Sequence, residues 1–134
     1  MSSSVRDTLK RHGIVITAQR LEIAGILLEK PQHLSADQII DRLKVRGSGV
    51  SKATVYNTLN MFSAQGLVKE VVVDPTRKFY DSTTHGHHHF YNVDTGELSD
   101  IPQSAIHIND LPELPEGTAS ESIEVLIKVR DLPQ

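Results

Sequence analysis

The sequence predicts an α+β fold in which an N-terminal winged helix-turn-helix domain, residues 1–80, is followed by a small α/β domain, residues 81–134. Two observations predict this fold. Apolar residues recur with helical spacing as far as Gly66 and alternate with polar residues beyond it. The change of period comes after three or four short helical segments and leads at once into a hairpin pattern, which is the element order of a winged helix.

Helical segments are predicted before Gly66, and each begins at a residue that caps helices, the first with a capping box formed by Ser4 and Asp7. After a short first helix, Thr17, Ser35 and Ser51 each offer a side-chain oxygen to the free amides of a helix start. Gln38 completes a capping box with Ser35. The apolar residues expected to face the core are Leu21, Ala24, Leu27, Leu28, Ile39, Ile40, Leu43, Val55, Leu59 and Phe62.

The segment after Gly66 has the pattern of a β-hairpin. Residues 67–73 are rich in β-branched side chains, residues 74–77 carry turn chemistry, and residues 78–80 form a return strand. A hairpin placed directly after the last helix predicts the wing of a winged helix.

The second half predicts a small sheet. Strands are expected over residues 88–93, 98–101 and 123–130, with a further short strand near Ile106 and Ile108. Three prolines between Pro102 and Gly117 exclude a long helix there. This half is too small to bury its apolar residues alone, so a homodimer interface is expected to complete its core.

The net charge of −3 is the sum of two halves of the chain that have opposite net charges. Residues 1–80 carry twelve basic and seven acidic residues, which gives +5, and residues 81–134 carry two basic and ten acidic residues, which gives −8. Five of the seven histidines also lie in the acidic half. A basic half suits a polyanion, whereas an acidic, histidine-rich half suits cations.

Several classes of protein are excluded by composition. Without cysteine there are no disulfides, thiolate zinc sites or thiol nucleophiles. No run of eighteen apolar residues is present, and the first residues lack the apolar stretch of a signal peptide. We therefore expect no membrane partner and a cytoplasmic location.

The last helix before the wing has a polar surface without acidic residues. Lys52 can contact a phosphate, and Asn57 can read adenine through two hydrogen bonds. Two basic residues in the wing are placed to reach a second stretch of backbone. The expected contacts to double-stranded DNA are Ser51, Lys52, Thr54, Tyr56, Asn57, Thr58, Arg77 and Lys78. A merely solvated helix face is the alternative interpretation.

A second cluster has the side chains of a metal site. It contains Asp81, His85, His87, His88, His89 and Asp100. On a strand, His87 and His89 point to one face and His88 to the other, which permits two distinct sites. A set of five or six nitrogen and oxygen ligands fits Fe²⁺ or Mn²⁺ better than a closed tetrahedral zinc site. A surface histidine run is the alternative, and His33 taken alone indicates a loop or core residue.

Taken together, these segments resemble the ferric uptake regulator family of metal-dependent bacterial repressors. The resemblance covers nearly the whole chain and depends on residues 13–20, 33–37, 53–59 and the histidine cluster. It implies a winged-helix DNA-binding domain, residues 1–80, a metal-binding dimerisation domain, residues 81–134, and a palindromic operator. The family's regulatory ligands correspond to His33, Asp81, His87, His89 and Asp100.

Two branches of the family compete. The ligand spacing and Asn57 are similar to the peroxide-sensing branch, which implies Fe²⁺ or Mn²⁺, with Zn²⁺ possible in vitro. Residues 87–91, 100–102 and 111–117 are similar to the iron response regulators of α-proteobacteria, which respond to haem or iron status. That resemblance makes haem a possible cofactor, although the Cys-Pro haem motif is absent. A second metal or haem site would use His88 and His107.

Other function classes fit less well. An enzyme needs an open coordination position with a general base beside it, and every carboxylate near the cluster is needed as a ligand. We therefore expect no enzymatic activity. A metal-buffering protein would leave the polar helix and the wing without a role, and a flat salt dependence of DNA binding would favour it. The sequence favours a homodimeric repressor of iron or oxidative-stress genes.

Overall fold

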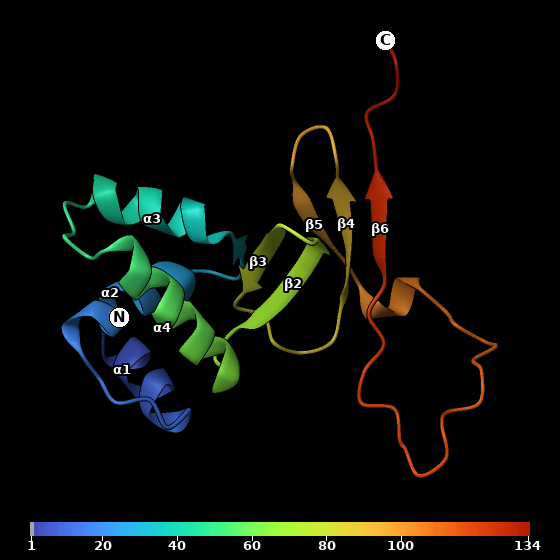
Figure 1. Cartoon of the computed structure of the whole chain (residues 1–134), viewed down its shortest axis with the longest axis horizontal. Helices are drawn as coiled ribbons and strands as arrows, with labels where there is room; N and C mark the ends of the chain where they lie inside the picture. The colour runs from blue at the N-terminus through green and yellow to red at the C-terminus, as the bar shows by residue number, and fades with distance from the viewer. Residues whose placement is uncertain (1) are drawn as a thin grey trace. The chain divides into compact units, whose positions relative to one another are not determined.

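The computed structural model describes the backbone of residues 2–134 and the side chains of residues 5–134. The chain forms two compact units, one ending at Thr84 and the other running from His85 to Gln134. Figure 1 shows the helices gathered in the first unit and a separate sheet in the second. The fold class is therefore α+β, as the sequence predicts.

The first unit contains the predicted helices. Their bounds are α1 Ser2–Arg11, α2 Ala18–Leu27, α3 Ala36–Val45 and α4 Lys52–Ala64. Three of the four predicted N-caps are present: the side chains of Thr17, Ser35 and Ser51 accept hydrogen bonds from backbone amides of α2, α3 and α4. The cap predicted at Ser4 was wrong, because α1 begins at Ser2. Ser35 and Gln38 form the expected reciprocal capping box.

Apolar side chains of the helices form the core of this unit. Ile39, Leu59 and Phe62 are fully buried. The prediction for α2 was partly wrong, because Ile23 and Ile26 are fully buried while Leu21 and Leu28 are only partly buried against the core. The buried face of α2 is therefore rotated relative to the predicted one.

The wing follows α4 through a tight helix end. Gly66 has φ +77°, and the amide of Leu67 donates to the carbonyl of Phe62 over 2.9 Å, which is the Schellman arrangement that glycine favours. Strand β2, Lys69–Asp74, then pairs antiparallel with β3, Arg77–Asp81. The predicted hairpin is confirmed.

The sequence did not predict β1, a strand of two residues, His33–Leu34. It pairs antiparallel with β3, so that the sheet order is β1-β3-β2. The pairing places His33 directly opposite Asp81, 48 positions later in the chain. A strand this short carries no detectable period, which is why the segment had the pattern of a loop.

The second unit is built on a mixed sheet of order β5-β4-β6. Its strands are β4 His88–Asn92, β5 Leu98–Ile101 and β6 Leu126–Val129, and a 3₁₀ turn, η1, covers Gln103–Ala105. β4 pairs antiparallel with β5 and parallel with β6. The expected strand near Ile106 and Ile108 was wrong: these residues are in no strand, and β6 is shorter than the predicted 123–130.

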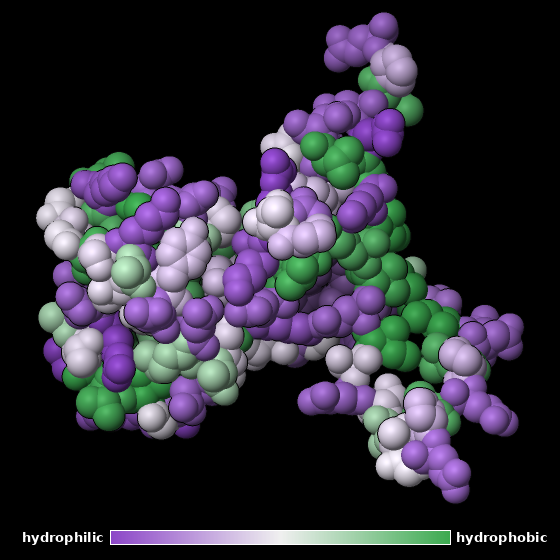
Figure 2. All heavy atoms as spheres, in the orientation of Figure 1, coloured by the Kyte–Doolittle hydropathy of each residue, from purple (hydrophilic) through white to green (hydrophobic). Residues whose placement is uncertain are grey.

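Apolar side chains are exposed along β6 and the segment that precedes it. Ile127 and Val129 on β6 are exposed, as are Ile108, Leu111 and Leu114. Figure 2 shows hydrophobic surface gathered over this part of the second unit. Among the described residues, no helix is long and apolar enough to cross a membrane.

Candidate nucleic-acid interface and metal centre

Helix α4 presents a polar surface at its N-terminal half. Lys52, Tyr56 and Asn57 are exposed, whereas Val55 and Leu59 fix the opposite face in the core. The Ser51 hydroxyl donates to the Thr54 hydroxyl over 2.9 Å and accepts from its amide over 3.1 Å. These bonds fix the first turn of α4. The Lys52 amine and the Asn57 amide remain exposed and accessible to a DNA groove.

The prediction that Thr58 faces away from the core was wrong. Thr58 is buried, with 7% exposure, and therefore faces the core rather than solvent. Its position three residues after Val55 and one before Leu59 places it on the edge of the apolar face of α4. A threonine can occupy such a position because its methyl group packs as an apolar group, and this is why a polarity-based prediction failed here.

The wing carries the two basic residues expected to meet phosphates. Lys78 lies 3.3 Å from the Glu70 carboxylate across the hairpin, and the Arg77 guanidinium lies 4.0 Å from Asp74. The backbone amide and the hydroxyl of Thr76 donate to Asp74, and these bonds hold the pKa of that carboxyl below its ordinary value. Asp74 therefore orders the turn through these hydrogen bonds, while Arg77 stays largely exposed.

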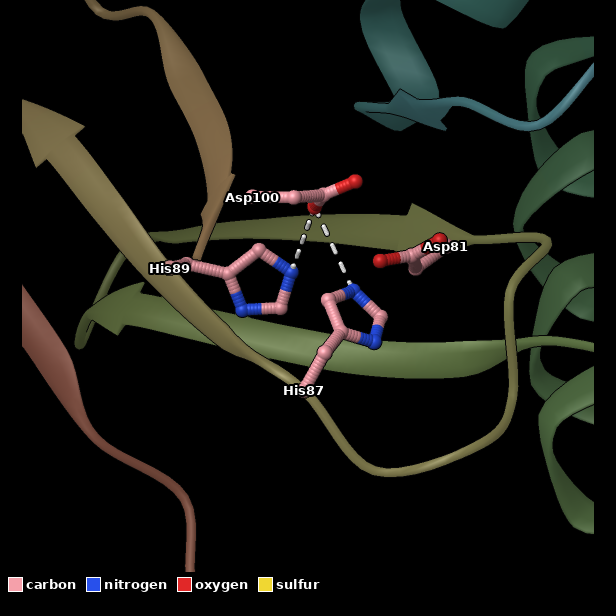
Figure 3. A group of neighbouring side chains, drawn as sticks. All are labelled: Asp81, His87, His89 and Asp100. Atoms are coloured by element: carbon pink, nitrogen blue, oxygen red, sulfur yellow. Dashed lines mark ion pairs between the residues drawn. The ribbon is translucent and has the colours of Figure 1, made fainter. Parts of the chain in front are cut away.

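Three potential metal ligands meet in the second unit (Figure 3). His87 Nε2 and His89 Nε2 each lie 3.3 Å from the same oxygen, Oδ1 of Asp100. The two imidazole rings are 4.4 Å apart between centroids, and both are buried. His89 and Asp100 are direct partners in the β4–β5 register, and His87 lies two residues before His89 on the same face.

The His87 ring is oriented by the backbone. Its Nδ1 lies 2.9 Å from the carbonyl oxygen of His85, so Nδ1 carries the proton and donates it. In the neutral ring the lone pair then lies on Nε2, the nitrogen that faces Asp100. A ligand histidine in proteins typically donates its other N–H to a carbonyl or carboxylate in this way. His85 contributes its carbonyl, while its side chain is exposed.

The first unit holds two further predicted ligands next to each other. His33 on β1 and Asp81 on β3 face each other in the antiparallel register. Asp81 is buried and accepts a 2.9 Å hydrogen bond from the amide of Thr83, and the His33 ring packs edge-on against Phe79 at 6.3 Å. Figure 3 labels Asp81 at the end of β3.

The remaining two predicted ligands lie apart from this arrangement. His88 is buried, and its Nδ1 accepts a hydrogen bond from the amide of Val125 over 2.9 Å. His107 lies in the exposed segment after η1. Among the described residues, the His/Asp group whose ligand atoms lie close enough to hold a metal includes none of His33, His88 and His107.

A polar recognition helix with a basic wing, together with a buried His/Asp cluster, defines the class of metal-responsive, winged-helix transcription regulators. Residues 11–125 match the ferric uptake regulator family. The chain therefore belongs to the ferric uptake regulator family. By that membership it is a metal-dependent transcriptional repressor, and the regulators of this family bind DNA and act as dimers.

Individual relatives agree with this membership. The peroxide-responsive repressor PerR of Staphylococcus epidermidis is 32% identical over 111 residues, which cover 77% of this chain and 74% of that protein. PerR of Staphylococcus saprophyticus is equally similar, at 32% over 111 residues, 77% of this chain and 75% of that protein.

Solved structures agree as well. The ferric uptake regulator of Pseudomonas aeruginosa, described with manganese, has a TM-score of 0.73 and 26% identity over 94% of this chain and 96% of that chain. The ferric uptake regulator of Vibrio cholerae has a TM-score of 0.74 and 25% identity over 93% of this chain and 98% of that chain.

Proposed function

We propose that the regulatory metal is Fe²⁺ or Mn²⁺, held by His87, His89 and Asp100 of the second unit and by His33 and Asp81 of the first. The observation that carries this proposal is the convergence of two imidazole nitrogens on one carboxylate oxygen, each at 3.3 Å. Three imidazoles and two carboxylates form a mixed nitrogen and oxygen set, which suits Fe²⁺ or Mn²⁺. Zn²⁺ would compete in vitro because imidazole also suits zinc.

The absence of thiolate ligands also supports Fe²⁺ or Mn²⁺ as the metal. The chain has no cysteine, so no thiolate biases the site toward zinc or copper(I). The solved relative from Pseudomonas aeruginosa, 26% identical to this chain, is described with manganese, in agreement with the proposed metal.

Participation of the first unit gives the metal a regulatory role. His33 and Asp81 are already adjacent across β1 and β3, and only five residues separate Asp81 from His87 in the chain. Each residue of such a linker extends at most ~3.3–3.6 Å. The His33–Asp81 pair therefore stays tethered at short range to the ligands of the second unit. Ligands taken from both units would fix the orientation of the winged helix relative to the dimerisation unit, which shifts the population toward a DNA-binding form.

The operator is a palindromic duplex bound in the cytoplasm by a homodimer, each winged helix placing α4 in the major groove of one half-site. Lys52, Tyr56 and Asn57 are the exposed groups at the start of α4, and Arg77 and Lys78 extend the contact to the backbone. A two-fold symmetric protein reads a two-fold symmetric sequence, which is the reason for expecting a palindrome.

Release of DNA by peroxide is the signal suggested by the peroxide-responsive relatives. With Fe²⁺ loaded, peroxide would transfer one oxygen atom to a ligand histidine and leave as water. Loss of that imidazole from the donor set would weaken the link between the units. Peptide mass mapping should locate the added oxygen on a ligand histidine in Fe²⁺-loaded protein and find none in Mn²⁺-loaded protein.

The proposal is tested by DNA binding of ligand variants. DNA is first selected from a random duplex pool with Mn²⁺-loaded protein, and binding is then measured by gel shift with and without Mn²⁺. We expect His87→Ala and Asp100→Ala to lose the Mn²⁺ dependence. His85→Ala is the matched control, because it keeps the carbonyl that accepts from His87. Unchanged Mn²⁺-dependent binding by both ligand variants would refute the site.

A further inference from the structure

We propose that His88 is a positioning residue that attaches β6 to the metal-ligand strand β4, and that it is not a ligand for a second metal or for haem. The inference rests on the proposed function only where it concerns the metal. The hydrogen bonding that carries it lies wholly within the second unit.

Two consecutive residues of β4 hold the same residue, Val125, which directly precedes β6. The Val125 amide donates to His88 Nδ1 over 2.9 Å, and the Val125 carbonyl accepts from the His89 amide over 3.1 Å. The parallel register then continues from His89 opposite Leu126 to Asn92 opposite Val129. Val125 is therefore the point at which the chain joins the sheet.

This junction follows a long segment of irregular structure. Between η1 and β6, residues 106–125 contain no helix or strand, and their apolar residues are largely exposed. Ordering such a segment costs conformational entropy, so a side chain that fixes its last residue determines where β6 begins. His88 is 4% exposed, and its Nδ1 satisfies the amide of the partly buried Val125.

The hydrogen bond also assigns the proton on the His88 ring. Because Nδ1 accepts from an N–H, its lone pair is occupied, and the proton of the neutral imidazole lies on Nε2. A ring in that state has no free nitrogen lone pair to give to a metal or to haem iron. His87 is the opposite case, with its proton on Nδ1 and its lone pair on Nε2.

Neighbouring histidines in the cluster thus have different roles set by their backbone partners. The carbonyl of His85 selects the metal-ready tautomer of His87, and the amide of Val125 selects the structural tautomer of His88. Since His89 carries the metal-facing nitrogen on the same strand, a movement of β4 would be transmitted through His88 to β6, whose exposed Ile127 and Val129 suit an interface with a second copy.

Two amide substitutions separate a role for Nδ1 from a role for Nε2. In His88→Asn the side-chain oxygen lies the same number of bonds from Cα as Nδ1, so it can still accept from Val125. In His88→Gln the polar group is one carbon further out, near the position of Nε2. Hydrogen exchange of the Val125 amide should lose roughly tenfold protection in the glutamine variant and be largely rescued in the asparagine variant.

The experiment uses the full-length protein and three readouts. Long-range ¹⁵N–¹H NMR of the apoprotein should give the Nε2–H tautomer for His88 and Nδ1–H for His87. Mn²⁺ stoichiometry should be the same in wild type and both variants, and haem titration should give no Soret shift that depends on His88. An Nδ1–H tautomer of His88, or loss of one bound metal or of the Soret shift in both variants, would overturn the inference.

Failure of the metal proposal is distinguishable from failure of this one. If the wild-type protein bound no Mn²⁺, the proposed regulatory site would be wrong, while the tautomer and the exchange of Val125 would still decide the role of His88. If a substituted protein failed to fold, the tautomer measured in wild-type protein would decide it alone.

Discussion

His89 and Asp100 face each other directly across β4 and β5, with His89 Nε2 3.3 Å from Asp100 Oδ1. The same carboxylate oxygen lies 3.3 Å from His87 Nε2. The Asp100 side chain is 56% exposed, so the pairing is open to solvent on the carboxylate side and buried on the imidazole side. A cation entering from solvent would meet the carboxylate first and the two nitrogens behind it.

Removing the Asp100 charge should abolish stabilisation by metal. A ligand that binds only the folded state stabilises it by about 2.7 kcal/mol at one hundred times its dissociation constant. We expect Mn²⁺ to raise the melting temperature of wild-type protein and to leave that of Asp100→Asn unchanged, as measured by scanning calorimetry. Glu97→Gln, an exposed carboxylate just before β5, is the control and should keep the full shift. A normal shift in Asp100→Asn would show that Asp100 is not a ligand.

Substitutions in α4 should distinguish a phosphate contact from a base contact. Lys52→Ala removes one phosphate partner, so the slope of log affinity against log salt should fall by about 0.9 and affinity should fall for all sequences alike. Asn57→Ala should leave the slope unchanged and cost about 1–3 kcal/mol at one base position. Fluorescence anisotropy over a salt series, with operator variants, measures both quantities. Equal effects of the two substitutions would contradict the assignment.

The capping box at the start of α3 should contribute measurably to stability. The Ser35 hydroxyl accepts from the Gln38 amide, and the Gln38 side chain accepts from the Ser35 amide over 2.9 Å. Ser35→Ala should lower the free energy of unfolding by about 1 kcal/mol in urea. Ser99→Ala, on the exposed face of β5, should change it by less than about 0.5 kcal/mol. A comparable loss in both variants would argue against a specific cap.

The parts of the fold that the sequence predicted are those with local chemical signals. Thr17, Ser35 and Ser51 mark helix starts because the first amides of a helix need acceptors, and Gly66 marks the end of α4 because it takes a positive φ. By contrast, β1 depends on pairing with residues nearly fifty positions away, and no local period reveals a two-residue strand.

The same distinction applies to the candidate site. His87 and His89 could be placed on one face from strand spacing alone, and their approach to Asp100 followed from the adjacent strand. The burial of Thr58 and the bond from Val125 to His88 could not be predicted, because both depend on packing between distant segments. The pairing of His33 with Asp81 likewise required the sheet register.

In the proposed function, one metal binds ligands of both units and thereby controls DNA binding. The most direct measurement is the Mn²⁺ dependence of DNA affinity in wild-type protein and in His33→Ala, with Mn²⁺ affinity measured in parallel. We expect at least a tenfold gain in DNA affinity for wild type, and no gain for His33→Ala even when it is saturated with Mn²⁺, because metal binding and the orientation of the winged helix are then uncoupled. The same Mn²⁺-dependent gain in His33→Ala would contradict the proposed function.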